Sequence, residues 1–356
     1  MDVVIAGTDE GAIPLALKLS AAGFRVGFYS PNPHISSLLE KHEGKTHYPL
    51  TRQEHIRLLA SGQLQRLDTP STDVEELYVY VNTLKNGVNR FADAENLVRE
   101  LADKTGKISQ LVLAGITKPG EALTLMELFN KRHGVLKHST GFLGAPHTKI
   151  GRPPSWTAGA PHPKTFSKLS TQPFRELEQA EHASILLTAA EALHRVAAAH
   201  NNMLLKTELT NELLGDGLFI RSESLDVLSY LSRLERVDEG SPKLYTYVLS
   251  SLRRAVERVE QEVLKEVKDM VRGSRRQVRV AVVSCDESYA KKIAATLSRA
   301  KIKTAYVNVD NLKARGQETF RGFKAAVLAS NEIYLMAELE KVCEKAWYIP
   351  SLGELS

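Results

Sequence analysis

The first part of the chain alternates between two hydrophobic patterns. Short runs of continuous or alternating apolar residues predict β-strands at 3–6, 24–29, 77–81 and 111–114. Apolar residues spaced by threes and fours predict helices between and after these strands, at 12–22, 93–105 and 121–131. Strands that alternate with helices at this spacing are typical of a parallel sheet covered on both faces. We therefore predict an α/β, Rossmann-like domain over residues 1–165.

The middle of the chain has only the helical pattern. Residues 176–203 contain neither Pro nor Gly and have apolar residues on nearly every side, which predicts a helix buried on more than one face. A second long helix is predicted at 243–271, with one apolar stripe and a charged outer face. The stripe favours ordinary core packing, with a coiled-coil or partner surface as the alternative. Residues 166–273 are thus predicted to form a helical domain.

The strand and helix alternation returns in the last part of the chain. Strands are predicted at 278–283, 303–307, 323–328 and 347–349, and helices at 289–300 and 335–345. This pattern predicts a smaller Rossmann-like domain over residues 274–356. The segment 144–163 is rich in Pro and Gly and is predicted to be a loop. It contains Gly-Ala-Pro-His twice, ending at His147 and His162; without a nearby carboxylate or thiol, we interpret this as chance recurrence and not as a metal site.

The first strand ends in a turn that resembles a dinucleotide-binding fingerprint. In the pattern G-x-G-x-x-G, Gly7 takes the first position, Asp9 the second and Ala12 the third, with Gly11 just before the predicted helix. A glycine at the second position lets the backbone approach a pyrophosphate, whereas Asp9 brings a negative charge there. Asp9 therefore either caps the helix or contacts a ligand directly, and the pattern leaves both open.

The end of the second strand carries no carboxylate. NAD-binding sheets usually have an acidic residue there, which bonds the ribose hydroxyls. Ser30 and Asn32 occupy this region. If a dinucleotide binds, this end of the site would not repel the 2′-phosphate of NADP.

Composition narrows the class of protein. The 356 residues are long enough for two or three domains, carry a net charge of +5 and include only two cysteines, so a disulfide framework is not expected. No apolar run has the length of a membrane span, and we expect a cytoplasmic protein that does not enter a membrane. One basic knot, made of Arg272, Arg275, Arg276 and Arg279, offers a nucleic-acid or anionic surface, although a solvated linker is the favoured interpretation.

The order of these elements resembles the UDP-glucose/GDP-mannose dehydrogenase family, as do several short stretches. Residues 13–16, Ile-Pro-Leu-Ala, are similar to the family's Leu-Pro-Leu-Ala; 81–83 stand where it has Val-Gly-Thr-Pro; 117–120 resemble its Val-Pro-Pro-Gly; and 180–183 fit the start of its central helix. The resemblance implies an NAD(P) site, a nucleotide or nucleotide-sugar ligand and a homodimer formed through the central helices. The cofactor residues it implies are Gly7, Asp9, Gly11, Ala12, Ser30, Asn32, Thr83 and Thr117.

The chain departs from the family at the positions that carry its chemistry. The family oxidises an alcohol to an acid through a thioester on a cysteine, but residues 201–273 contain no cysteine; the nearest counterpart of that loop is 214–219. The family's lysine and asparagine on the central helix fall at Ser184 and Thr188. Its other polar site residues fall at Ala114, Ile116 and His147.

Two functions are consistent with these departures. The first is a catalytically silent relative that keeps the fold, with or without a bound nucleotide, and acts as a partner or regulatory subunit. The second is an NAD(P)-dependent oxidoreductase with simpler two-electron chemistry, in which His147 or His182 relays the proton. A lone histidine is more often structural, so His147 is only a weak catalytic candidate.

Overall fold

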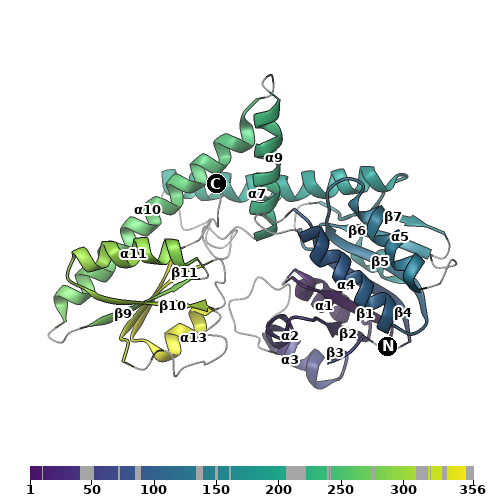
Figure 1. The fold of residues 1–356 in the computed structure, drawn as a ribbon, viewed down its shortest axis with the longest axis horizontal. Coiled ribbons are helices and arrows are strands. Elements are labelled where there is room, and N and C mark those ends of the chain that lie inside the picture. Colours follow the sequence, from purple (N-terminus) through teal and green to yellow (C-terminus); the bar gives the residue numbers. More distant parts are fainter. Residues whose placement is uncertain are drawn as a thin grey trace. The chain divides into compact units, whose positions relative to one another are not determined.

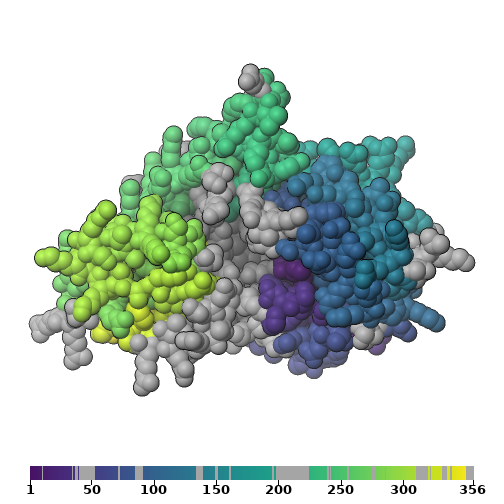
Figure 2. All heavy atoms as spheres, viewed as in Figure 1, coloured from purple at the N-terminus to yellow at the C-terminus, as the bar shows by residue number. Residues whose placement is uncertain are grey.

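The structure is a computed structural model of residues 1–356. It describes the chain except for residues 10, 41–51, 71–72, 85–89, 134–138, 149–150, 160–161, 206–221, 239, 241, 275–277, 285, 310–319, 321, 331–334 and 350–356. Two compact units are present: unit 1 comprises Met1–Arg195 with Glu223–Tyr230, and unit 2 comprises Val196–Ser222 with Leu231–Ser356. Figure 1 labels the helices and strands, and Figure 2 shows the atoms of the described residues in colour.

Unit 1 is built on a sheet of eight strands among the described residues, in the order β3-β2-β1-β4-β5-β6-β7-β8. Its strands are β1 (Val3–Gly7), β2 (Val26–Tyr29), β3 (Leu64–Leu67), β4 (Val74–Asn82), β5 (Ile108–Ile116), β6 (Ser139–Gly144), β7 (Pro154–Ala158) and β8 (Gln172–Pro173). The strands β1 to β6 are parallel and follow the order 3-2-1-4-5-6 of a dinucleotide-binding sheet. The predicted Rossmann-like fold class is therefore confirmed.

Helices cover the sheet of unit 1. They are α1 (Ala12–Ala21), α2 (Pro33–Glu40), α3 (Arg52–Ala60), α4 (Arg90–Lys104), α5 (Glu121–His133), α6 (Lys164–Leu169) and the first part of α7 (Leu177–Leu205). The helices α4 and α5 pack side by side over one face (Figure 1) and share a core with Val79, Leu113 and Phe142. On the face of Gly7, α1 lies so close that a Cβ on Gly7 would be 2.6 Å from the Cβ of Ala12. Only glycine permits this approach.

One sequence prediction for unit 1 is wrong. The Pro- and Gly-rich segment 144–163, predicted to be a loop, contains the strand β7, which pairs antiparallel with β6. Proline is tolerated as the first residue of a strand, and Pro154 takes that place. Pairing with a neighbour distant in sequence decides the conformation here, because β-propensity depends strongly on tertiary context.

The helical segment is divided between the two units. Besides α7 it contains α9 (Ser222–Val237) and α10 (Leu244–Gly273). The Glu235 carboxylate, near the end of α9, accepts hydrogen bonds from the backbone N–H groups of Tyr245 (2.8 Å) and Thr246 (2.9 Å) at the start of α10. Burial raises the pKa of Glu235, but these bonds outweigh it and lower the pKa overall. The carboxylate thus joins the two helices into a hairpin.

Unit 2 contains a second, smaller sheet. Its strands β9 (Arg279–Ser284), β10 (Lys303–Asn308), β11 (Ala325–Ala329) and β12 (Lys345–Ile349) are parallel, in the order β10-β9-β11-β12. They are accompanied by α11 (Glu287–Arg299) and α13 (Leu335–Val342). The apolar stripe of α10, including Val256, Val263 and Val267, belongs to the core of this sheet. From Val256 onward the interpretation of the stripe as core packing is confirmed, whereas its first residue, Leu244, is 50% exposed.

The C-terminus of α11 ends in a left-handed residue. The N–H of Ile302 donates to the carbonyl of Leu297 (3.2 Å), and the N–H of Lys301 donates to that of Ser298 (2.8 Å). These two bonds form a Schellman motif, in which glycine is the preferred residue at the left-handed position. Lys301 occupies that position with φ 62°. Lys301 therefore has a side chain at a position where the backbone conformation favours glycine.

Replacing Lys301 with glycine is expected to stabilise unit 2 by about 0.5–1 kcal/mol, because the left-handed conformation then costs less. The chain has two tryptophans, Trp156 in unit 1 and Trp347 in unit 2. In a Trp156→Phe background, urea unfolding followed by Trp347 fluorescence measures this unit. Lys303→Gly, a strand position, serves as the control and is expected to destabilise it. A lower midpoint for K301G than for the parent would contradict the argument.

Candidate functional site

The candidate cofactor site lies where the strand order of unit 1 reverses. The connections from β1 and from β3 leave in opposite directions, so the carboxyl ends of β1 and β4 form the switch point at which open α/β sheets bind ligands. Gly7 at the end of β1 pairs with Tyr80 on β4. The helix α1 begins directly after this turn. The structure therefore places the predicted residues Gly7, Asp9, Gly11 and Ala12 at the expected point of the fold.

Asp9, at the second position of the fingerprint, contacts the start of α1. Its Oδ1 accepts a hydrogen bond from the backbone N–H of Gly11 (3.1 Å), the N-cap residue of α1. The carbonyl of Asp9 accepts another from the N–H of Ala12 (3.2 Å). The carboxylate therefore lies just outside the helix and engages a backbone donor of the kind that phosphates use at helix N-termini.

The turn after β2 contains Ser30 and Asn32, which stand where an acidic residue is usual in NAD-binding sheets. The N–H of Asn32 donates to Ser30 Oγ (3.2 Å), and Ser36 Oγ donates to the Ser30 carbonyl (3.3 Å). Ser30 is buried. These bonds shape the turn that leads into α2.

The two predicted threonines lie at the carboxyl ends of β4 and β5, and each holds a carboxylate. Thr117 Oγ1 donates to Oε1 of Glu181 on α7 (2.7 Å), and Thr83 Oγ1 donates to Oε2 of Glu121. Thr83 Oγ1 also accepts from the N–H of Lys118 (3.2 Å). Both threonines are buried. Together they order the turn that leads from β5 into α5.

Glu181 is the residue here to which the sequence assigned no role. Its carboxylate is fully buried and accepts the N–H groups of Gly120 (2.8 Å) and Ala122 (3.0 Å), besides the Thr117 hydroxyl. It therefore caps the N-terminus of α5 from another helix, where a negative charge is favourable. A charged residue on a helix predicted to be buried on more than one face was the available signal.

The next polar positions of α7 lie against the ends of β5 and β6. Ser184 Oγ donates to the carbonyl of Gly115 (3.3 Å), and Thr188 Oγ1 donates to the carbonyl of Ser184 (2.9 Å); both side chains are fully buried. A Cβ on Gly144, at the end of β6, would be 2.6 Å from the Ser184 Cβ. The helix thus packs on the strand ends at a distance that only small residues allow.

His147 follows β6 and turns toward the switch point. Its Nδ1 lies 3.2 Å from the hydroxyl oxygen of Tyr80, and both side chains are buried. Tyr80 is therefore the neighbour of Gly7 in the sheet and contacts His147 through its hydroxyl. The other two histidines are not part of this group: His162 bonds Thr157 (2.7 Å) in an exposed position, and His182 lies beside Glu178, with its side chain 58% exposed.

Several predicted features lie outside the described residues. These are the loop 214–219, Arg275 and Arg276. Within the part of the chain that the structure describes, no group of three or more His, Cys, Asp or Glu side chains could hold a metal ion. None of its helices combines the length and hydropathy needed to cross a membrane.

Glu181→Ala is expected to destabilise unit 1 by about 3 kcal/mol or more, because three hydrogen-bond donors lose their charged acceptor in a buried site. In a Trp347→Phe background, the fluorescence of Trp156 follows the urea unfolding of this unit. Glu178→Ala on the same helix is the matched control; its side chain is 71% exposed, so its effect should stay within about 0.5 kcal/mol. Equal effects of the two variants would refute the capping role of Glu181.

Comparison with known proteins agrees with this architecture. No family model matches the sequence, and a search of curated proteins finds no significant relative. Among solved structures, a UDP-glucose dehydrogenase from Pyrobaculum islandicum is similar over 98% of this chain and 96% of its own, with 15% identity and a TM-score of 0.54. A UDP-D-ManNAc dehydrogenase from Pyrococcus horikoshii is similar over 100% of this chain and 96% of its own, with 12% identity and a TM-score of 0.51. The chain thus has a nucleotide-sugar dehydrogenase-like fold.

Proposed function

We propose that this protein is a divergent nucleotide-sugar dehydrogenase-like protein that retains a nucleotide site without the family's oxidation chemistry. The family's reaction needs a thiolate that attacks an aldehyde intermediate, and residues 201–273 offer no cysteine for that step. It also needs a cationic side chain on the central helix to stabilise the developing oxyanion. The position that resembles this lysine is Ser184.

The packing of Ser184 is the observation that carries the proposal. Its hydroxyl donates to a backbone carbonyl of β5, and its Cβ would be 2.6 Å from a Cβ on Gly144. That distance requires glycine at position 144, because any Cβ there would clash with the Cβ of Ser184. Full burial and the bond to the Gly115 carbonyl give Ser184 a structural role that requires no part in a reaction.

The test is turnover by the purified full chain. With UDP-glucose, UDP-ManNAc or GDP-mannose and either NAD or NADP, no reduced cofactor should form above the rate without protein. Reduction of cofactor at an ordinary enzymatic rate with any of these sugars would overturn the proposal. Oxidation of a simple alcohol that disappears in a His147→Gln variant would instead support two-electron chemistry at the Tyr80–His147 pair.

Dinucleotide binding at the β1–α1 turn is the second part of the proposal. Asp9→Asn keeps an oxygen acceptor for the Gly11 N–H but removes the negative charge next to the pyrophosphate position. Two unit charges about 4 Å apart in water interact by about 1 kcal/mol, so the dissociation constant of NAD or NADP should fall roughly fivefold. Isothermal titration calorimetry measures this change. Because Ser30 and Asn32 present no carboxylate, NADP should bind at least as well as NAD.

The matched control for this variant is Asp286→Asn. Asp286 accepts the N–H of Tyr289 (3.0 Å) at the N-terminus of α11 in unit 2, so it is a comparable carboxylate in another domain. Dinucleotide affinity should not change in this control. If the Asp9→Asn protein binds NAD or NADP no better than the parent, the turn is excluded as the dinucleotide site.

A homodimer through the central helices is the third part. The end of α9 and the start of α10 expose four large apolar side chains: Leu234 (49%), Val237 (84%), Leu244 (50%) and Tyr247 (70%). A gathering of this kind on a hairpin tip is typical of an association surface. The family resemblance also places dimer contacts on this segment, which favours a second copy of the chain as the partner.

Val237→Glu combined with Tyr247→Glu is expected to convert a dimer into a monomer, because two charges would be buried at the contact. Light scattering coupled to size-exclusion chromatography gives the molecular mass. Ile56→Glu is the control, since Ile56 is 51% exposed on α3 of unit 1. A monomeric parent protein, or the same shift in the control, would exclude this surface as the dimer contact.

A further inference from the structure

The amino-terminal edge of the sheet in unit 2 carries a row of cations. The strands β9, β10 and β12 begin with Arg279, Lys303 and Lys345, and Lys324 immediately precedes β11. Since the four strands are parallel, these residues meet at the same edge. Lys301 lies two residues before β10 and extends the row.

Some of these cations form ion pairs with carboxylates, and the others do not. Lys324 pairs with Glu344 (3.1 Å) and Lys345 with Glu266 (3.3 Å). Arg279, Lys301 and Lys303 have no carboxylate within ion-pair distance among the described residues, and all three are exposed. Positive charge is therefore concentrated on β9 and β10.

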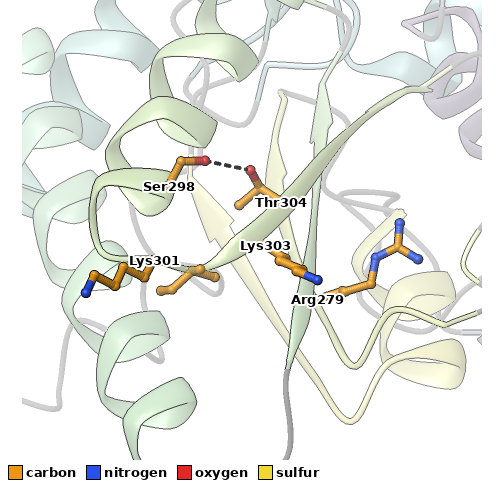
Figure 3. Close-up of a pocket in the computed structure, with 6 residues that line it drawn as sticks. Arg279, Ser298, Lys301, Lys303 and Thr304 are labelled. Atoms are coloured by element: carbon orange, nitrogen blue, oxygen red, sulfur yellow. Dashed lines mark hydrogen bonds between the residues drawn. The ribbon is translucent and has the colours of Figure 1, made fainter.

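The three uncompensated cations line an open recess. Together with Ser298, Ile302 and Thr304 they surround a volume of about 680 Å³. Figure 3 shows the side chains of Lys303 and Arg279 running toward the same side, while Lys301 leaves at the other end. The charges thus form a line and do not converge on one point. Ser298 and Thr304 hydrogen-bond each other (3.3 Å) between them.

Two features of this recess lower the stability of the folded unit when nothing is bound. Lys303 and Arg279 are direct neighbours in the strand register, and like charges in that arrangement repel. Lys301 holds a left-handed conformation in which glycine is preferred. An anion bound in the recess would relieve the repulsion. The guanidinium of Arg279 also lies 4.7 Å from the centre of the Phe323 ring, which holds it in place.

We propose that this recess binds successive phosphates of a nucleic-acid backbone. A line of cations in an open groove fits a chain of phosphates better than a single anion, which needs converging donors. The exposed Arg272, at the end of α10, belongs to the basic segment that leads into β9. The sequence favoured a solvated linker for that segment; the tertiary structure adds Lys301 and Lys303, which are distant from it in sequence.

The experiment is fluorescence anisotropy of a labelled oligothymidine with the full-length protein over a range of salt concentrations. The parent should bind at low salt and lose affinity steeply as salt rises. Arg279→Gln combined with Lys303→Gln should weaken binding by about tenfold at low salt and reduce the salt slope by about 1.4, or about 0.7 for each lost phosphate contact. Lys301→Gly should also weaken binding, although it relieves the backbone.

The matched control removes two other exposed lysines of unit 2, by Lys265→Gln with Lys291→Gln. The net charge changes equally, so an equal loss of affinity in this control would overturn the proposal. Absence of binding by the parent at low salt would also overturn it. Inorganic polyphosphate, added as a competitor, distinguishes a nucleic-acid backbone from other chains of phosphates. If the parent protein binds polyphosphate but no oligonucleotide, nucleic acid is excluded as the ligand of the recess.

Discussion

The buried carboxylate of Glu181 joins the long helix α7 to the sheet of unit 1. It accepts two N–H groups at the start of α5 and the hydroxyl that ends β5, all within 3.0 Å. Burying a carboxylate costs free energy unless its oxygens accept hydrogen bonds. Here the N-terminus of α5 supplies two N–H donors and also a favourable helix dipole. The position of α7 along the strand ends follows from this contact.

The contact also sets what the rest of α7 presents to the sheet. Ser184 and Thr188 follow Glu181 at helical spacing, so they lie on the same face of α7 and are fully buried. That face is polar, although the helix is apolar over most of its circumference. Its hydroxyls bond backbone carbonyls, which lets the helix approach Gly144 closely. The close approach of α7 therefore requires glycine at position 144.

The turn at the end of β1 also places a carboxylate at a helix N-terminus. Asp9 accepts the N–H of Gly11 and so brings a negative charge to the start of α1. In unit 2 the excess charge is positive and lies at the amino ends of the parallel strands instead of the carboxyl ends. Arg279 and Lys303 are adjacent there, without carboxylate partners among the described residues. The charge patterns of the two units thus differ both in sign and in the edge of the sheet that carries them.

The sequence by itself determined the fold class, the approximate limits of most strands and helices, and the place of the Gly7 turn, because hydrophobic periodicity and glycine punctuation are local signals. It did not reveal β7 or the capping role of Glu181. It also left Lys301 and Lys303 apart from Arg279. Each of these depends on strands or helices that meet only after folding, and their hydrogen bonds and repulsions act across elements distant in the chain. Tertiary structure therefore decided which polar residues are buried in structural contacts and which stay exposed.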